Sequence, residues 1–221
     1  MSRSAAPRII LIHAYRHSLP PIEQAFRKLW PKAEVLSLVD EALYADIDPD
    51  GVAKPTIRER VRTLFSHALV SGAEAIVFTG STFGPIVEEA RRGMPVPVLK
   101  SDESMAMEAV DRGGRALLVC TAQRALPVIA RTIMDQAEAS GADIDLATLV
   151  VAGAKHAIDI GDVELHNRLI AQAILDAGHS DSILLGQLSM SDVPALLPAE
   201  IARKVLSNAE ATVRRLRLLL S

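Results

Sequence analysis

Short apolar runs alternate with amphipathic helical stretches along most of this chain. Several of these runs are continuously apolar, as expected for strands of a parallel sheet that helices cover on both faces. We therefore expect a doubly wound α/β fold. The predicted strands are residues 9–12, 34–38, 75–79, 96–99, 116–120, 147–151 and 182–185.

Polar start signals and closing glycines bound the predicted helices. Thr56 with Glu59 has the pattern of a capping box, and Ser101 and Asp162 are further candidate caps. Apolar residues at helical spacing follow these signals, and glycines end three of the helices. The apolar stripes are Ile57, Val61, Leu64, Ala68 and Leu69 before Gly72; Leu126, Ile129, Ile133, Met134 and Ala137 before Gly141; Leu165, Leu169, Ile170 and Ile174 before Gly178; and Ile201, Val205, Ala209, Val213, Leu216 and Leu220 in one final helix.

One unit of this pattern occurs twice. Residues 75–85 (AIVFTGSTFGP) and 182–190 (SILLGQLSM) are each a short apolar run that ends in small polar residues. The repetition predicts two similar lobes, with a matching strand end from each lobe facing one cleft. We expect a first lobe at 1–105 and a second at 106–221, and the C-terminal helix can pack back on the first lobe.

Composition and charge narrow the range of partners. The net charge of −3 gives no electrostatic basis for binding nucleic acid or an anionic membrane, and an aromatic content of 3% offers few platforms for stacking bases. No apolar run approaches the roughly 20 residues that a membrane helix needs. The single cysteine, Cys120, excludes an internal disulfide and a cysteine-rich metal site. We expect a cytoplasmic protein, and an exposed apolar helix face is compatible with a homodimer or a higher homo-oligomer.

The two echoed turns are candidate ligand sites. Residues 79–82 follow a predicted strand, and open α/β sheets bind ligands beyond the carboxyl ends of their strands. A helix that starts near Pro85 leaves backbone N–H groups free for a carboxylate or phosphate, and Ser81 and Thr82 add hydroxyl donors. Ser189 offers the same chemistry in the second turn. Serine and threonine are also common helix caps, so capping alone is the alternative explanation for both turns.

On these pieces the chain resembles the aspartate/glutamate racemase superfamily, which also contains hydantoin racemases, maleate isomerases and arylmalonate decarboxylases. The resemblance covers nearly the whole chain, and the order and spacing of its motifs are more specific than any single one. The matching motifs are residues 12–14 (IHA), 78–85 (FTGSTFGP), 97–100 (PVLK), 153–154 (GA) with 161–162 (GD), and 187–190 (QLSM).

The resemblance implies cofactor-independent chemistry at a carbon acid next to a carboxylate. In the two-base members, a cysteine ends the key strand of each lobe. One thiolate removes the α-proton, and the other thiol delivers a proton to the opposite face. Backbone N–H groups and hydroxyls hold the carboxylate and stabilise charge as the carbanion forms. The residues expected to bind a small carboxylate substrate here are Thr79, Ser81, Thr82, Thr121 and Ser189.

This sequence departs from the family pattern at both cysteine positions. Gly80 stands where the first cysteine belongs, and Gln187 stands where the second belongs. Glycine has no side-chain proton, and an amide is a poor acid and a poor base, so the two-thiol mechanism is not possible. The decarboxylase members resemble this chain in having glycine at the first position, but they depend on a cysteine at the second.

Two other residues are candidates for the missing acid and base. His13 follows the first strand, where a histidine of near-neutral pKa suits acid–base chemistry, or where it is simply a hydrogen-bonded structural residue. Cys120 ends the fifth strand beside Thr121, but a small buried cysteine is the commoner role. His13 and His17 lack a third ligand, so we expect no metal site.

Three functions therefore remain open. The first is a racemase or isomerase of a small carboxylate, such as an amino acid or a related carbon acid. The second is a lyase or decarboxylase on a substituted malonate-like acid, which needs only one proton donor. The third is a carboxylate-binding protein that has lost catalysis.

Overall fold

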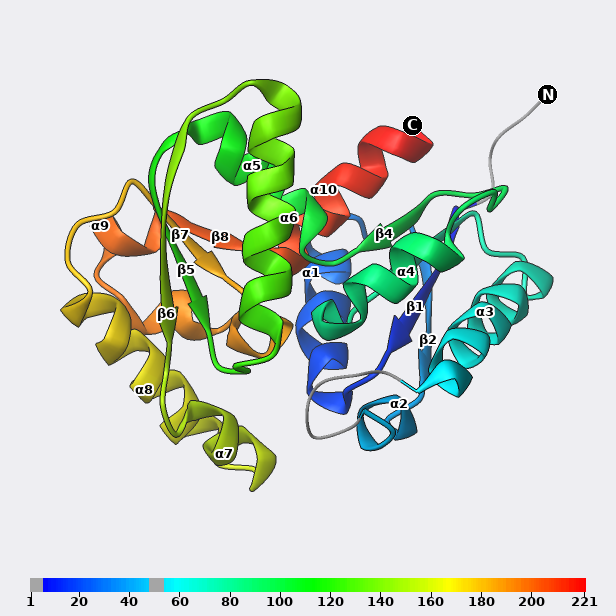
Figure 1. Ribbon diagram of the computed structural model, residues 1–221, viewed down its shortest axis with the longest axis horizontal. Helices are drawn as coiled ribbons and strands as arrows, with labels where there is room; N and C mark the ends of the chain where they lie inside the picture. The colour runs from blue at the N-terminus through cyan, green and yellow to red at the C-terminus, as the bar shows by residue number, and fades with distance from the viewer. Residues whose placement is uncertain (1–5, 48–53) are drawn as a thin grey trace. The chain divides into compact units, whose positions relative to one another are not determined.

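The computed structural model describes residues 6–47 and 54–221. The chain forms two compact units, one made of Met1–Ser101 with Thr212–Ser221 and the other of Asp102–Ala211. The division falls at Ser101, before the predicted boundary at residue 105. Both units contain a four-stranded parallel sheet, which is the α/β architecture that the apolar runs predict (Figure 1).

The sheet of the first unit has the strand order β2-β1-β3-β4. Its central strand β1 pairs with β2 on one side and with β3 on the other, so Ile12 lies beside both Leu38 and Phe78. The strands are β1 (Arg8–His13), β2 (Glu34–Val39), β3 (Ala75–Phe78) and β4 (Val98–Lys100). The α-helices are α1 (Leu19–Leu29), α2 (Ala42–Ala45), α3 (Pro55–Val70) and α4 (Gly84–Ala90).

The second unit repeats this arrangement with the order β6-β5-β7-β8. In each unit the first strand in sequence lies between the second and the third, and the fourth strand pairs with the third. The two sheets therefore share one strand order, as the predicted internal repeat requires. The strands are β5 (Gly114–Cys120), β6 (Ile144–Val150), β7 (Ser182–Leu185) and β8 (Val205–Ser207). The helices are α5 (Glu103–Arg112), α6 (Ala125–Ser140), α7 (Ala154–Asp159), α8 (Val163–Asp176), α9 (Ala199–Ala202) and α10 (Asn208–Leu220), the last running from the second unit into the first.

Each unit has its own apolar core. In the first unit, strand residues such as Ile10 and Ile76 pack with one stripe of α3, and this stripe includes Phe65, which the sequence pattern did not single out. Leu64 and Leu69, two of the predicted stripe positions, are only half-buried. The second unit has two clusters, one containing Leu118 of β5 with residues of α5 and α6, and one containing Ile170 of α8.

Several predicted helix boundaries are confirmed. α3 and α8 end just before Gly72 and Gly178, and α6 ends at Gly141, where all three glycines have positive φ. The side chain of Asp162 caps α8 by accepting a hydrogen bond of 2.9 Å from the backbone N–H of Leu165.

Other predicted boundaries are wrong, and the strand predicted at 147–151 begins earlier, at Ile144. α3 begins at Pro55 after Lys54, so Thr56 is inside the helix and forms no cap. α5 begins at Glu103 with Asp102, rather than Ser101, at its N-cap position. β4 begins at Val98 because Pro95 and Pro97, which lack backbone N–H groups, flank Val96.

The single final helix predicted over residues 201–220 is also wrong. The short helix α9 ends at Ala202, and residues 205–207 form β8. Parallel pairing places Val205 beside Ile183 and Leu206 beside Leu184, and Leu206 is buried. Pairing with a strand far away in sequence therefore overrides the helical spacing of these apolar residues.

All aromatic side chains of the chain lie in the first unit. The four phenylalanines, two tyrosines and one tryptophan all fall between residues 15 and 83, and the second unit contains none of them. Tyr44 packs edge-on against Phe83, and Phe83 packs edge-on against Phe78. Within the part of the chain that the structure describes, no helix combines the length and the apolar character needed to cross a bilayer.

Candidate functional site

The carboxyl ends of β1 and β3 bring His13 and Thr79 together in the first unit. The two strands are parallel neighbours, and the backbone N–H of Thr79 donates to the carbonyl of Ile12 at 2.9 Å. His13 is the last residue of β1, and Thr79 directly follows β3. Sheet pairing thus joins two candidates that are far apart in the sequence.

A buried hydrogen-bond network surrounds His13. Its Nδ1 lies 2.7 Å from Oγ of Ser18 and 2.9 Å from Oγ1 of Thr79. The Ser18 hydroxyl donates to the carbonyl of Tyr15 at 2.6 Å and lies 2.9 Å from Oγ1 of Thr79. Burial lowers the pKa of His13 to about 4, so the imidazole is neutral at pH 7. Ser18 was not among the sequence candidates, because its only signal is its position in the turn after β1.

Gly80 lies in a tightly packed place rather than in an open one. A Cβ atom built at Gly80 would lie 2.9 Å from Cδ2 of Phe83, 3.0 Å from Cε1 of Phe78 and 3.2 Å from Cβ of Ala14. Two aromatic rings therefore occupy the space where a side chain at this position would begin. A cysteine here would require both rings to move.

The two hydroxyl side chains that follow Gly80 differ in their burial. Ser81 is buried and begins a 3-10 turn, Ser81–Phe83, that precedes α4. The helix start near Pro85 is confirmed, since α4 begins at Gly84. Oγ1 of Thr82 lies 3.2 Å from the Tyr44 hydroxyl at the surface.

In the second unit, the ends of β5 and β7 bring Cys120, Thr121 and Gln187 together. The amide oxygen of Gln187 accepts a hydrogen bond of 2.7 Å from the backbone N–H of Thr121 and one of 3.3 Å from its hydroxyl. These two donors fix the orientation of the Gln187 carboxamide. The structure thus links the Gln187 position to Thr121, and both were predicted site residues.

Cys120 is fully buried against the backbone of Gly186. A Cβ atom at Gly186 would lie 2.5 Å from Sγ of Cys120, so only glycine allows this close approach. Burial raises the pKa of the Cys120 thiol to about 11, while a hydrogen bond with Gln187 lowers it and the charge of Asp102 raises it further. Cys120 is therefore a protonated thiol at neutral pH.

The turn after β7 differs from the turn after β3. Ser189 lies in a 3-10 turn, Leu188–Met190, and a second 3-10 turn, Val193–Leu196, follows it. The Ser191 hydroxyl donates back to the carbonyl of Leu188 at 2.8 Å. An α-helix start equivalent to Pro85 is therefore not repeated in the second unit.

Asn208 lies beside the candidate site, and the sequence pattern does not single it out. It is buried at the start of α10, directly after β8, and its amide donates to the carbonyl of Gly186 at 3.1 Å. It thereby supports the backbone beside Gln187. The missed strand β8 explains the omission, because Asn208 was expected inside a long helix.

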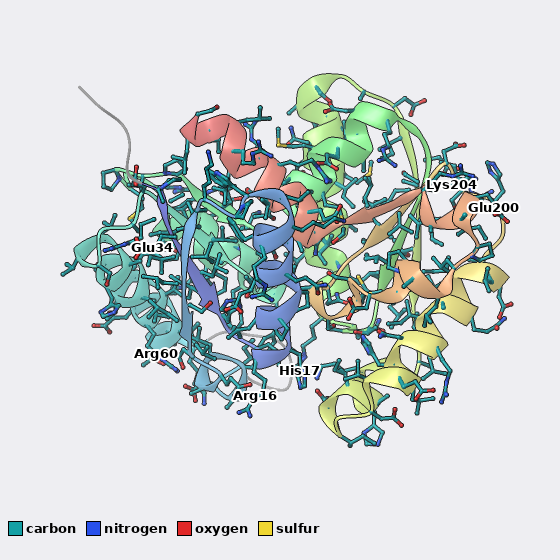
Figure 2. The ribbon with its side chains drawn as sticks, turned by 180° about the vertical axis from the view of Figure 1, so that it is seen from behind. Arg16, His17, Glu34, Arg60, Glu200 and Lys204 are labelled. Atoms are coloured by element: carbon teal, nitrogen blue, oxygen red, sulfur yellow. The ribbon has the colours of Figure 1, made fainter. Side chains whose placement is uncertain are left out.

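The acidic residues that follow β2 are neutralised by arginines. Asp40 accepts a hydrogen bond of 2.6 Å from Arg60, and Glu41 pairs with Arg16; both arginines are labelled in Figure 2. In the same unit, Lys100 at the end of β4 is buried and pairs with Glu88 at 2.7 Å. Across residues 6–47 and 54–221, no group of three histidine, cysteine or acidic side chains is arranged to hold a metal ion.

Comparison with known proteins identifies the family. The Asp/Glu/hydantoin racemase family model matches residues 4–216. An allantoin racemase from Klebsiella pneumoniae is similar in structure, with a TM-score of 0.75, 19% sequence identity, and coverage of 97% of this chain and 88% of that one. A glutamate racemase from Campylobacter jejuni has a TM-score of 0.70 at 12% identity, with coverage of 96% and 85%.

An aspartate racemase homologue from Pyrococcus horikoshii has a TM-score of 0.68 at 15% identity and covers 96% of this chain and 98% of its own length. No curated protein matches the sequence. At these identities the structures show the shared fold, and the family model extends over nearly the whole sequence. The resemblance drawn from the motifs is confirmed: the chain belongs to the Asp/Glu/hydantoin racemase family.

Proposed function

We propose that this protein is a cofactor-independent racemase or isomerase that moves a proton at the α-carbon of a small carboxylate. The observation that carries the proposal is that polar residues follow the same two strands in both sheets. His13 and Thr79 lie at the ends of β1 and β3, and Thr121 and Gln187 lie at the ends of the matching strands β5 and β7. Membership of a racemase family supports this reaction class.

In this chain the roles of proton acceptor and proton donor fall to two different kinds of side chain instead of two thiols. His13 is a neutral imidazole and is the proposed proton acceptor, whereas Cys120 is a protonated thiol and is the proposed proton donor. Burial makes the imidazole a weaker base and the thiol a weaker acid than the free groups. Gly80 and Gln187 mark the positions of the missing cysteines. Hydroxyls and backbone N–H groups at Ser81, Thr82 and Ser189 bind the carboxylate, the group beside which negative charge develops.

A lyase that decarboxylates a substituted malonate-like acid is the second candidate. Such a reaction needs one proton donor after loss of CO₂, and Cys120 is a single thiol that burial keeps protonated. The rings packed around Gly80 favour a third alternative, a carboxylate-binding protein without catalysis, because they leave no room for a second thiol.

Proton exchange in D₂O separates the three functions. The protein is incubated with amino acids, hydantoins and substituted malonates, and deuterium at the α-carbon and release of CO₂ are both measured. Deuterium with inversion supports the racemase, and CO₂ release supports the lyase. Ligand binding with neither result contradicts both enzymes and supports the binding protein.

We also propose that the protein is cytoplasmic and forms a homodimer or a higher homo-oligomer. The support for this part is limited to single exposed apolar side chains such as Val70, Ile160 and Leu218. Size-exclusion chromatography with light scattering tests this part, and a monomer at all concentrations would contradict it.

A further inference from the structure

We propose that Ser18 is a positioning residue that holds His13 in the Nδ1–H tautomer. In this tautomer Nε2 carries a lone pair, which can accept a hydrogen bond or a proton. The use of this acceptor in proton transfer depends on the proposed function. The proton on Nδ1 follows from the hydrogen-bond geometry and can be tested without a substrate.

The first step concerns the hydrogen of the Ser18 hydroxyl. Its Oγ lies 2.6 Å from the carbonyl oxygen of Tyr15. This distance is typical of an O–H···O hydrogen bond, and a carbonyl oxygen can only accept. The Ser18 hydroxyl is therefore the donor, and its only hydrogen points at Tyr15.

The second step assigns the proton on His13. Nδ1 of His13 lies 2.7 Å from the same Ser18 oxygen, which has no further hydrogen to donate. Two lone pairs at this distance would repel, so Nδ1 must carry the hydrogen and donate it to Ser18. Oγ1 of Thr79 also lies 2.9 Å from Nδ1. With Nδ1 protonated, the Thr79 hydroxyl donates elsewhere, because it has acceptors in Ser18 at 2.9 Å and in the carbonyl of Ile12 at 3.3 Å.

The third step follows for the other ring nitrogen. With the proton on Nδ1 of a neutral ring, Nε2 is an acceptor. It is buried, and it has no hydrogen-bond partner among the residues that the structure describes. A buried polar atom without a partner is costly to stability, so a donor group brought to Nε2 would restore the missing hydrogen bond.

The surroundings set the chemical class of that ligand group. The nearby carboxylates Asp40 and Glu41 are bound to arginines, and His13 itself is neutral. A lone pair repels a carboxylate, so the group that Nε2 accepts from in the proposed reaction must be a donor, either an uncharged N–H or the α-C–H. In the second case the C–H bond breaks, the N–H bond forms at Nε2, and the electron pair passes into the adjacent carboxylate group. The Nδ1–H bond to Ser18 then stabilises the imidazolium.

Nitrogen NMR of the intact protein tests the tautomer directly. In the wild-type protein labelled with ¹⁵N-histidine, we expect His13 to show a protonated Nδ1 and an unprotonated Nε2 at pH 7. His166 is an internal control, because its Nδ1 lies 2.8 Å from the carbonyl of Ala154 and must also carry the proton. In Ser18→Ala, the His13 signals should move toward the Nε2–H tautomer that a free imidazole prefers, while those of His166 stay unchanged.

The kinetic readout uses the substrate found by proton exchange. Ser18→Ala should lower kcat by roughly tenfold or more with little change in KM, and Ser18→Thr, which keeps the hydroxyl, should restore most of it. An Nε2–H or doubly protonated His13 in the wild-type spectrum overturns the inference, and so does a His13 tautomer that is unchanged in Ser18→Ala. The wild-type spectrum decides even where the variant does not fold. An Nδ1–H tautomer in a protein that exchanges no substrate proton supports the tautomer and contradicts the proposed function.

Discussion

His13 links the stability of the protein to pH. The folded protein binds a proton at His13 only near pH 4, whereas the unfolded chain binds it near the ordinary value of 6.5. Between these values the unfolded state holds more protons, so the contribution of His13 to stability is complete above about pH 6.5 and is lost as the pH falls toward 4. A shift of this size corresponds to about 3 kcal/mol.

We therefore expect the free energy of unfolding of His13→Gln to depend less on pH than that of the wild-type protein. The amide of glutamine does not titrate, so the difference between the two proteins should shrink by up to about 3 kcal/mol from pH 7 to pH 4. Urea titrations at several pH values measure this difference. Parallel pH profiles for the two proteins would mean that His13 is protonated equally in the folded and unfolded states.

Gly80 can be tested through the ring that crowds it. Gly80→Ala places a methyl group against Phe83 and Phe78 and should lower the free energy of unfolding by about 1–3 kcal/mol. In a Phe83→Leu background the same change should cost less by about 1 kcal/mol, because the nearest ring atom is gone. Chemical denaturation of the four proteins gives this coupling. Additive effects would show that the ring and the glycine do not interact.

At the scale of single elements, α8 depends on a side-chain cap. Asp162→Ala removes the acceptor for the Leu165 N–H and should lower the free energy of unfolding by about 1 kcal/mol. Asp162→Asn keeps an acceptor and is the matched control, with a loss of only a few tenths of a kcal/mol expected by the same principle. Equal losses in both variants would mean that the charge rather than the hydrogen bond stabilises the helix.

Features of the fold that depend on a local signal can be predicted from the sequence. The Asp162 cap and the end of α6 at Gly141 were predictable, because a cap and a left-handed glycine act within one turn. β8 was not predictable from spacing, since residues 205–207 become a strand only by pairing with β7. The Ser18 hydroxyl was missed for a related reason, because its role needs His13 and Thr79 from adjacent strands.

At the scale of the whole molecule, the internal repeat was the most reliable prediction of fold class. Both sheets have the same strand order, and each places its polar turn after the third strand of the unit. The separate chemistry of the two turns was not foreseen. A histidine network forms in one unit, and a thiol beside an ordered carboxamide forms in the other. Both depend on side chains that neighbouring strands bring together, so the repeated local sequence does not predict them.

We expect the two units to unfold together. α10 runs without a break from Asn208–Ala211 of the second unit into the first, where Thr212 donates to the carbonyl of Ser101 at 3.2 Å. Unfolding of either unit would therefore disrupt α10, which also belongs to the other unit. Urea midpoints from tryptophan fluorescence and from far-ultraviolet circular dichroism should coincide. Separate midpoints would show that each unit is an independent cooperative domain.

The uneven placement of aromatic residues has a practical consequence for such work. The second unit has no intrinsic fluorophore, because Trp30 and both tyrosines belong to the first unit. A ligand that bound solely beside Cys120 and Gln187 would leave intrinsic emission unchanged and be scored as a non-binder. A tryptophan introduced into the second unit would provide a fluorescence signal there. Leu196→Trp is one example, because the Leu196 side chain is 51% exposed.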